Sequence, residues 1–474
     1  MPATNNLGGK LRRWPKTKII ATLGPAVDSY EKVSALIEAG VNGVRLNFAY
    51  GTDEHRAKQI AWVRRAAKAA TLQVAIIQDL PGPKLHLGDF DDLLAVSPGK
   101  HYSFSYQADY AADGHVPLAF DAARHARRGH RLLTNDGRLR FMITAVKDGV
   151  IFARAENEGV LVRRKGINLP DSDFSADILT AKDRQSVAFG LEHGVDHVAL
   201  SFVHGPADIH KLRRLLNNLG SRAKIIAKIE TQSAVNQMEG IIDEADLVMV
   251  ARGDLASETM PEQVPVLQKK IVELALRHGK PSIVATQLLA GMVDRPDPSR
   301  AEIADIAAAV MMGADAVLLA DETAVGKHPL ESVAMLERVV GYTERHLDVN
   351  KPPPAPHLNR QAAVCRVVVE LSARLAASAI VAETKSGATA VQLSCERPRL
   401  PILAVTASHQ VARQLAVVYG VKSYVRPIDK YTGQGLTDWL ARQRILKKGD
   451  TVVSCQGRYP GVMGATDTIK ARVV

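Results

Sequence analysis

The 474-residue sequence is poor in cysteine, in aromatic residues and in long apolar runs, and each shortage excludes a class of protein. Its three cysteines, Cys365, Cys395 and Cys455, lack the spacing of a metal site and are too few for a disulfide scaffold. No apolar run approaches the roughly 20 residues of a membrane-spanning helix, and residues 1–15 lack the apolar segment of a secretory signal. We therefore expect a cytoplasmic protein that does not contact a membrane.

Aromatic residues make up 5% of the chain, which leaves few side chains for stacking on nucleic-acid bases. The net charge is +11, from 61 Lys and Arg against 50 Asp and Glu, but the basic residues are scattered. Scattered positive charge is more typical of an enzyme that attracts anionic substrates, or of a solvated surface, than of nucleic-acid binding. No nucleic-acid partner is therefore predicted. The GxxxxGK[ST] motif is also missing, so a nucleotide would bind without a P-loop.

What the sequence does contain is a repeated alternation of short β-branched runs with helix-like amphipathic segments. The runs begin at Thr17, Gly43, Gln73, His197, Lys224, Leu247, Pro281 and Ala316. Strands that alternate with helices indicate right-handed parallel units, and the near-continuous hydrophobicity indicates a sheet covered on both faces. Eight units match a closed barrel. The predicted fold class is α/β, a (β/α)8 TIM barrel.

Two segments depart from the simple barrel. Roughly 115 residues separate the third and fourth runs, where a few would suffice, and their turns and short β-type runs predict an inserted β-barrel lid domain. The segment KPPPAP predicts a stiff linker to a C-terminal α/β domain. The expected divisions are an N-terminal arm at 1–16, the barrel at 17–86 and 167–350, the lid at 87–166 and a C-terminal α/β regulatory-type domain at 357–474.

Polar residues follow many of the predicted strands, at the end where a barrel of this kind has its active site. Glu230 and Asp254 close two neighbouring strands, so both carboxylates can reach one divalent cation; all-oxygen ligation suits Mg2+ or Mn2+. Two simpler explanations remain open. Lys228 and Glu230 lie two residues apart on one strand face and could form only an interior ion pair, and Asp254 could only cap the following helix.

Positive groups gather at the same predicted mouth. Arg45 and Asn47 share a strand face, and with Lys228 they would form a pocket suited to a phosphoryl group. Thr286 adds a hydroxyl at the seventh strand. Three backbone N–H groups could hold a carboxylate at the start of the next helix, those of Ala251, Arg252 and Gly253.

The order and spacing of these motifs resemble the pyruvate kinase family over nearly the whole chain. The matching segments include TKIIATLGPA, GVRLNFAYG, DLPGPKL, RKGINLP, IIAKIE, VMVARGDL, ATQLL, SRAEIADIAAAV, DETAVGKHP and, in the tail, SGATA and ARQLAVVYGV. The resemblance implies a barrel with an inserted lid and a C-terminal regulatory-type domain. It implies the glycolytic transfer of phosphate from phosphoenolpyruvate to ADP, giving pyruvate and ATP, by a homotetramer.

The resemblance also assigns roles to residues. Lys228 would stabilise the migrating phosphoryl group, Arg45 would contact the phosphate, and Thr286 would belong to the relay that protonates the enolate. Glu230 and Asp254 would hold the metal. The substrate carboxylate would lie beside Thr286, at Ala251, Arg252, Gly253 and Asp254. The nucleotide would lie near Asn47, Tyr50 and His86.

Several positions depart from the family pattern. RLNFAYG replaces RLNFSHG, so Ala49 stands for a serine that ligates K+ in many members, and Tyr50 for a histidine near the nucleotide. DLPGPK resembles the members that work without K+, in which a lysine ammonium occupies the place of the ion. K+-independent activity is therefore expected, with the equivalent of the K+ site formed by Asn47, Asp79, Leu80 and Lys84.

Other departures leave alternatives open. His86 and His204 replace arginines, and histidine is largely neutral at pH 7. Thr231, Ala308, Met312 and Asp321 differ from the family as well. Sequence drift would explain these changes, but so would a divergent paralogue with an altered nucleotide, a different acceptor or a regulatory role. A divalent-metal pyruvate aldolase or lyase is a further alternative, against which the inserted lid and the tail domain argue.

Overall fold

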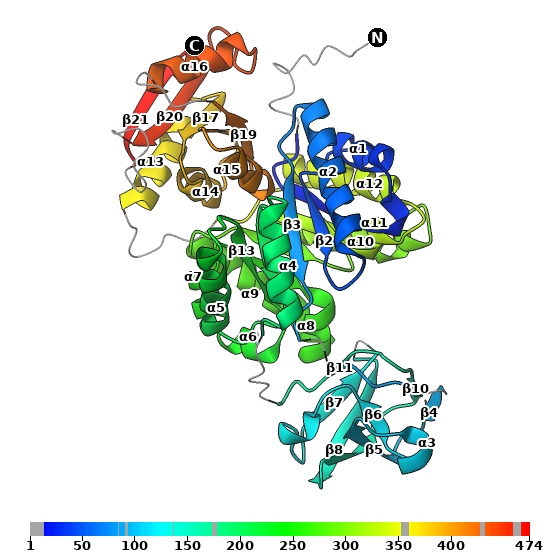
Figure 1. Ribbon diagram of the computed structural model, residues 1–474. Helices are drawn as coiled ribbons and strands as arrows, with labels where there is room; N and C mark the ends of the chain where they lie inside the picture. The colour runs from blue at the N-terminus through cyan, green and yellow to red at the C-terminus, as the bar shows by residue number, and fades with distance from the viewer. Residues whose placement is uncertain are drawn as a thin grey trace.

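Eight parallel strands close into a barrel at the centre of the molecule, as the sequence predicts (Figure 1). The computed structural model describes residues 14–83, 85–90, 93–135, 137–172, 178–351, 360–426, 432–457 and 466–474. Around the barrel the order is β1-β16-β15-β14-β13-β12-β3-β2, so each strand pairs with its predecessor and successor in the repeat. The strands are β1 (Lys18–Leu23), β2 (Gly43–Asn47), β3 (Ala75–Leu80), β12 (His197–Leu200), β13 (Lys224–Ile229), β14 (Leu247–Ala251), β15 (Ser282–Ala285) and β16 (Ala316–Leu319).

The strands are apolar on both faces because the barrel has an inner and an outer core. Alternate residues such as Ile20, Ile77, Ile226 and Met249 fill the barrel interior. Their neighbours along each strand pack against the surrounding helices. The larger helices are α1 (Tyr30–Glu38), α2 (Asp53–Ala70), α4 (Ala181–Glu192), α5 (Pro206–Asn218), α7 (Met238–Glu244), α9 (Val264–Arg277), α10 (Arg300–Met312) and α12 (Pro329–His346). None of the helices in the described ranges is long and apolar enough to cross a membrane.

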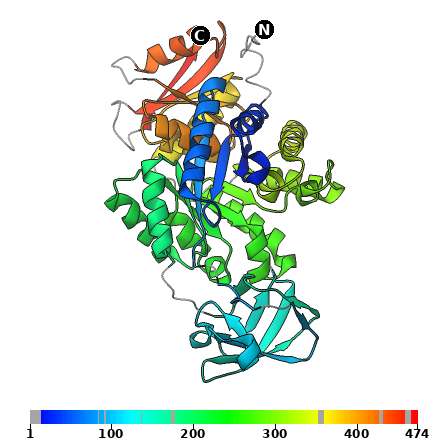
Figure 2. The same ribbon diagram turned by 45° about the vertical axis from the view of Figure 1, so that its right-hand side comes forward.

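A separate sheet domain is inserted between β3 and α4 and projects from one end of the barrel (Figures 1 and 2). Its six-stranded sheet has the order β11-β7-β8-β9-β5-β6, and a two-stranded ribbon pairs β10 with β4. The strands are β4 (Leu94–Val96), β5 (His101–Tyr106), β6 (Val116–Leu118), β7 (Arg131–Thr134), β8 (Leu139–Lys147), β9 (Val150–Ala155), β10 (Gly159–Leu161) and β11 (Ile167–Asn168). The domain has its own apolar core, in which Phe104 and Phe141 pack edge to face at 5.3 Å. We call it the lid domain.

The C-terminal domain is a five-stranded sheet with helices, at the opposite end of the barrel from the lid domain (Figure 2). Its strand order is β19-β18-β17-β20-β21, parallel except for β21. The strands are β17 (Ala379–Glu383), β18 (Ile402–Thr406), β19 (Val421–Val425), β20 (Thr451–Gly457) and β21 (Thr466–Val473), and the helices are α13 (Arg360–Arg374), α14 (Ala388–Cys395), α15 (His409–Gln414) and α16 (Thr432–Arg442). The predicted KPPPAP linker lies, after its first lysine, outside the described residues.

Two buried aspartates attach the C-terminal domain to the amino ends of the barrel strands. Asp315, just before β16, forms an ion pair of 2.6 Å with Arg397, and both side chains are completely buried. Asp196, just before β12, accepts hydrogen bonds from Arg64 of the barrel and from Arg413 of the C-terminal domain. The C-terminal domain therefore covers the end of the barrel opposite to its carboxyl mouth.

Candidate active site

The carboxyl ends of β2, β3, β12 and β13 bring four polar side chains together at the barrel mouth. Arg45 projects from β2, Asp79 from β3 and Lys228 from β13, and Ser201 follows β12 directly. The register aligns Asn47 of β2 with Asp79 of β3, so the residues on these neighbouring strands reach the same level. The parallel strands thus bring residues that are far apart in the sequence into one cluster.

Asp79 is the shared counter-ion of this cluster. Its Oδ2 accepts a 2.6 Å hydrogen bond from Arg45 Nε, and its Oδ1 lies 3.5 Å from Lys228 Nζ. Burial by itself would raise the pKa of Asp79, but the nearby Lys228 ammonium and Arg45 guanidinium hold that pKa below its usual range. The carboxylate therefore stays ionised and fixes the spacing of the two cations.

Lys228 is buried and held by three oxygen-bearing groups. Its Nζ donates a 2.6 Å hydrogen bond to Ser201 Oγ and lies 3.2 Å from Glu230 Oε2, in addition to its contact with Asp79. Burial would lower the pKa of Lys228, but the carboxylates of Asp79 and Glu230 outweigh burial and raise it. A permanently protonated ammonium cannot act as a base. It can stabilise negative charge that develops beside it.

Glu230 has one carboxylate oxygen in a hydrogen bond and the other in an ion pair. Its Oε1 accepts a 2.7 Å hydrogen bond from the backbone N–H of Phe202. Its Oε2 is buried and accepts no hydrogen bond, because the Lys228 ammonium at 3.2 Å is not aligned as a donor. Burial raises the pKa of Glu230 to about 7, and the carboxylate of Asp254 adds to this increase. A buried oxygen without a hydrogen bond calls for an explanation, and a bound ion as a further partner is one.

Asp254 lies on α8 (Arg252–Glu258), which starts where β14 ends. Its carboxylate contributes to the raised pKa of Glu230. Within the described ranges, no cluster of three or more His, Cys, Asp or Glu side chains could hold a metal ion. Two carboxylates alone fit an ion such as Mg2+, which usually takes one or two protein carboxylates and leaves its other positions to substrate and water.

The predicted substrate-carboxylate segment turns sharply at the mouth. Gly253 N donates a 2.9 Å hydrogen bond to Thr286 Oγ1, which joins the start of α8 to the end of β15. The side chain of Arg252 points in another direction, toward the backbone carbonyl groups of Ala285 and Thr286 and the carboxylate of Asp305. Thr286 and Gly253 are thus brought together, while the Arg252 side chain forms hydrogen bonds with other groups of the protein.

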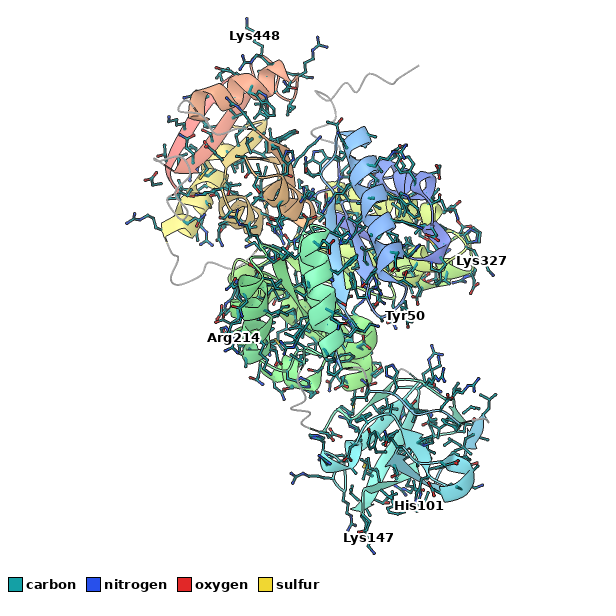
Figure 3. The ribbon with its side chains drawn as sticks, in the orientation of Figure 1. Tyr50, His101, Lys147, Arg214, Lys327 and Lys448 are labelled. Atoms are coloured by element: carbon teal, nitrogen blue, oxygen red, sulfur yellow. The ribbon has the colours of Figure 1, made fainter. Side chains whose placement is uncertain are left out.

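The residues predicted for the nucleotide are spread over the rim. Tyr50 is 74% exposed and lies on the side of the barrel nearest the lid domain (Figure 3). Asn47 Oδ1 accepts a hydrogen bond from Ala49 N. His86 pairs with Gly166 at the base of the lid domain. Of the predicted K+-site equivalent, Asp79 and Leu80 are buried, and Lys84 lies outside the described residues.

Sequence reasoning assigned no role to Ser201, Thr22 or Asp305. Ser201 was visible only as a polar residue at a strand end, and its hydrogen bond to Lys228 depends on the barrel closing. Thr22 Oγ1 accepts a hydrogen bond from Arg45 Nη1 at 3.3 Å. Asp305 carried one weak signal, as the single charged residue in the apolar stretch IADIAAAV.

Comparisons with known proteins identify the family of the chain. The model of the pyruvate kinase barrel domain matches residues 14–333, and that of the pyruvate kinase alpha/beta domain matches residues 362–471. Pyruvate kinase 2 of Synechocystis sp. is 38% identical over 473 residues, covering 97% of this chain and 79% of the relative. The pyruvate kinase of Agrobacterium vitis is 40% identical over 435 residues, covering 89% of this chain and 88% of the relative. The pyruvate kinase of Mycobacterium tuberculosis is 36% identical over 463 residues, covering 95% of this chain and 97% of the relative. The chain belongs to the pyruvate kinase family and is a phosphotransferase.

Proposed function

We propose that the protein transfers the phosphoryl group of phosphoenolpyruvate to ADP, giving pyruvate and ATP, with Mg2+ and without a requirement for K+. The observation that carries the proposal is the buried Lys228 ammonium, which lies 3.2 Å from the buried carboxylate of Glu230. Carboxylates such as those of Glu230 and Asp254 are the ligand type that suits a hard cation. Phosphoryl transfer through a loose transition state requires mainly positioning and positive charge from a protein. The mouth offers both.

Each side chain has a definite part in this proposal. Lys228 stabilises the charge that develops on the phosphoryl group, since its ammonium is fixed and protonated. Arg45 contacts the phosphate. The carboxylate of Asp79 lies between the Arg45 guanidinium and the Lys228 ammonium and contacts both. Thr286 positions a hydroxyl beside the backbone of Gly253, where the enolate would receive its proton.

Glu230 and Asp254 are the residues that would hold the divalent metal. When bound, the metal would supply charge neutralisation of the phosphoryl and enolate oxygens. The contacts of Glu230 fix its orientation, because Phe202 N donates to Oε1 and the Lys228 ammonium lies 3.2 Å from Oε2. The nucleotide would approach from the side of the lid domain, near Asn47, Tyr50 and His86.

The proposed reaction is tested by measuring pyruvate formation from phosphoenolpyruvate and ADP in the presence of Mg2+. We expect turnover that depends on both substrates. Turnover with another nucleoside diphosphate but not with ADP would instead indicate altered specificity, consistent with His86 and His204 at positions where the family pattern has arginine. Thermal stabilisation by phosphoenolpyruvate without turnover would indicate a regulatory paralogue.

Replacing Glu230 by glutamine should weaken metal binding. The amide keeps the shape of the side chain but offers a neutral oxygen, so the Mg2+ concentration for half-maximal activity should rise by at least the roughly 10- to 100-fold seen when a partner of a metal ligand is lost. Mn2+ binding, followed by electron paramagnetic resonance without substrates, should weaken in parallel. The matched control is Glu262→Gln, on an exposed turn. Unchanged Mn2+ affinity in Glu230→Gln would remove this carboxylate from the metal site.

Potassium should have little effect on the wild-type enzyme. Its activity in K+ should agree with that in tetramethylammonium within about twofold. The reason is that the Lys84 ammonium is proposed to supply the charge that K+ supplies in the K+-dependent members of the family. Lys84→Glu should lower activity and make it respond to K+. The control Lys100→Glu, at an exposed lid position, should behave like the wild type. A strict K+ requirement in the wild type would contradict the proposal.

The proposal extends to the setting of the enzyme. We infer a cytoplasmic homotetramer, on the strength of the family and of three buried, unbridged cysteines in the described residues, Cys365, Cys395 and Cys455. Light scattering coupled to size-exclusion chromatography measures the assembly directly.

A further inference from the structure

Thr286 has a strained backbone conformation at the barrel mouth. Its φ is +70° and that of the next residue, Gln287, is +58°. A β-branched residue in the left-handed region is an outlier, with a cost of order 1–3 kcal/mol that the surrounding structure must offset. In this conformation the Thr286 hydroxyl accepts the 2.9 Å hydrogen bond from Gly253 N.

The Arg252 guanidinium donates hydrogen bonds to the backbone carbonyl groups of this strained segment. Its Nε donates to Ala285 O at 3.3 Å and to Thr286 O at 3.1 Å, and its Nη2 also donates to Thr286 O. Arg252 is 6% exposed, so solvent does not compete for these donors. Two nitrogen atoms of one planar group on the same carbonyl oxygen fix both its position and its orientation.

Asp305 holds the other edge of the same guanidinium. Arg252 Nη1 donates to Asp305 Oδ1 at 2.8 Å and Oδ2 at 2.7 Å, with a weaker contact of 3.4 Å to Gln268 Oε1 on α9. Asp305 itself lies on α10, which begins with a capping box between Ser299 and Glu302. The chain of contacts therefore runs from an outer helix, through Arg252, to the main chain of Thr286.

We propose that Asp305 is a positioning residue of the phosphotransferase. It immobilises Arg252, and Arg252 in turn holds the Thr286 carbonyl and maintains the strained turn. The hydroxyl of Thr286 then stays beside Gly253 at the mouth. The inference rests on the proposed function, in which this hydroxyl serves proton delivery to the enolate of pyruvate. Asp305 touches neither substrate nor metal in this scheme.

Asp305→Asn tests the idea with little change of shape. The amide keeps one acceptor but loses the charge and the two-oxygen contact with Arg252 Nη1, so the guanidinium is held less firmly and the Thr286 turn can relax. We expect kcat to fall by up to about 100-fold, the effect of a misplacement near 1 Å. The KM for phosphoenolpyruvate should change by less than about threefold, because Arg45 and Lys228 bind the phosphate independently. Asp305→Glu, which retains a carboxylate, should recover part of kcat.

Two measurements separate positioning from general damage. In a Thr286→Ala background, Asp305→Asn should lower kcat no further, since the group it positions is already gone. Exchange of the methyl protons of pyruvate with deuterium oxide, followed by NMR, should slow in Asp305→Asn as kcat does. The control is Glu273→Gln, which removes a carboxylate from a surface pair with Lys269 on the neighbouring α9. It should leave kcat and exchange unchanged.

The outcomes distinguish this inference from the proposed function. A wild-type enzyme that does not convert phosphoenolpyruvate and ADP overturns the proposed function and the inference with it. An active wild type, together with an Asp305→Asn enzyme of normal kcat, overturns the inference alone. So does a multiplicative loss in the Thr286→Ala background, because that pattern means that Asp305 acts elsewhere in the structure.

Discussion

Replacing Lys228 by methionine should lower kcat by roughly 100- to 1,000-fold, the effect of removing one preorganised donor in a site of this type. That loss corresponds to about 3–4 kcal/mol of transition-state stabilisation. The physical reason lies in the surroundings of the ammonium. It is buried, protonated and held by Asp79, Ser201 and Glu230, so no reorganisation is needed when charge develops beside it.

The control for this prediction is Lys224→Met on the same strand. Lys224 begins β13 at the amino end of the barrel, where it forms an ion pair with Asp246 at 3.1 Å. Both variants lose one lysine of one strand, but only Lys228 faces the mouth. We expect Lys224→Met to keep the kcat of the wild type. Full turnover by Lys228→Met would remove this ammonium from the mechanism and would leave the cluster as a structural ion pair.

Replacing Arg397 by methionine should be the most destabilising of the changes considered, at about 3–5 kcal/mol, because it leaves a buried charge without its partner. Arg397 and Asp315 are both fully buried, and Arg397 Nη2 also donates to Gly313 O. Asp315 would keep hydrogen bonds from the backbone N–H groups of Ser282 and Tyr419, but it would lose its only ion pair in the described residues.

Calorimetry of the whole chain measures this loss, and Arg399→Met provides the comparison. Arg399 lies two residues further along and pairs with Asp348, but both side chains are about 80% exposed. Its removal should cost less than about 1 kcal/mol, as is usual for an exposed pair. Equal stability of the two variants would show that the buried pair contributes no more than a surface pair does.

The barrel was predictable because its signal is local. A run such as KIIAKI carries β-branched residues on both faces, and burial of both faces is what a barrel strand requires. Polar residues at the strand ends then identified the mouth, and the two-residue spacing placed Lys228 and Glu230 on one face. The structure has that contact at 3.2 Å.

What could not be predicted depends on side chains meeting after the chain has closed. Asp305 lies 53 residues from Arg252, and Arg397 lies 82 residues from Asp315. Neither pair has a spacing that a periodic pattern could reveal. The strained Thr286 was hidden for another reason: left-handed backbone is usually signalled by glycine, and here a β-branched residue occupies the position.

The attachment of the C-terminal domain to the foot of β12 has a mechanical consequence. Asp196 lies at one end of a short extended segment and accepts a hydrogen bond from Arg413. Ser201 lies at the other end and accepts a hydrogen bond from Lys228. Five residues of extended chain span about 17 Å and can hardly lengthen. A displacement of the C-terminal domain at Asp196 would therefore be transmitted along β12 to Ser201, which accepts the hydrogen bond from Lys228.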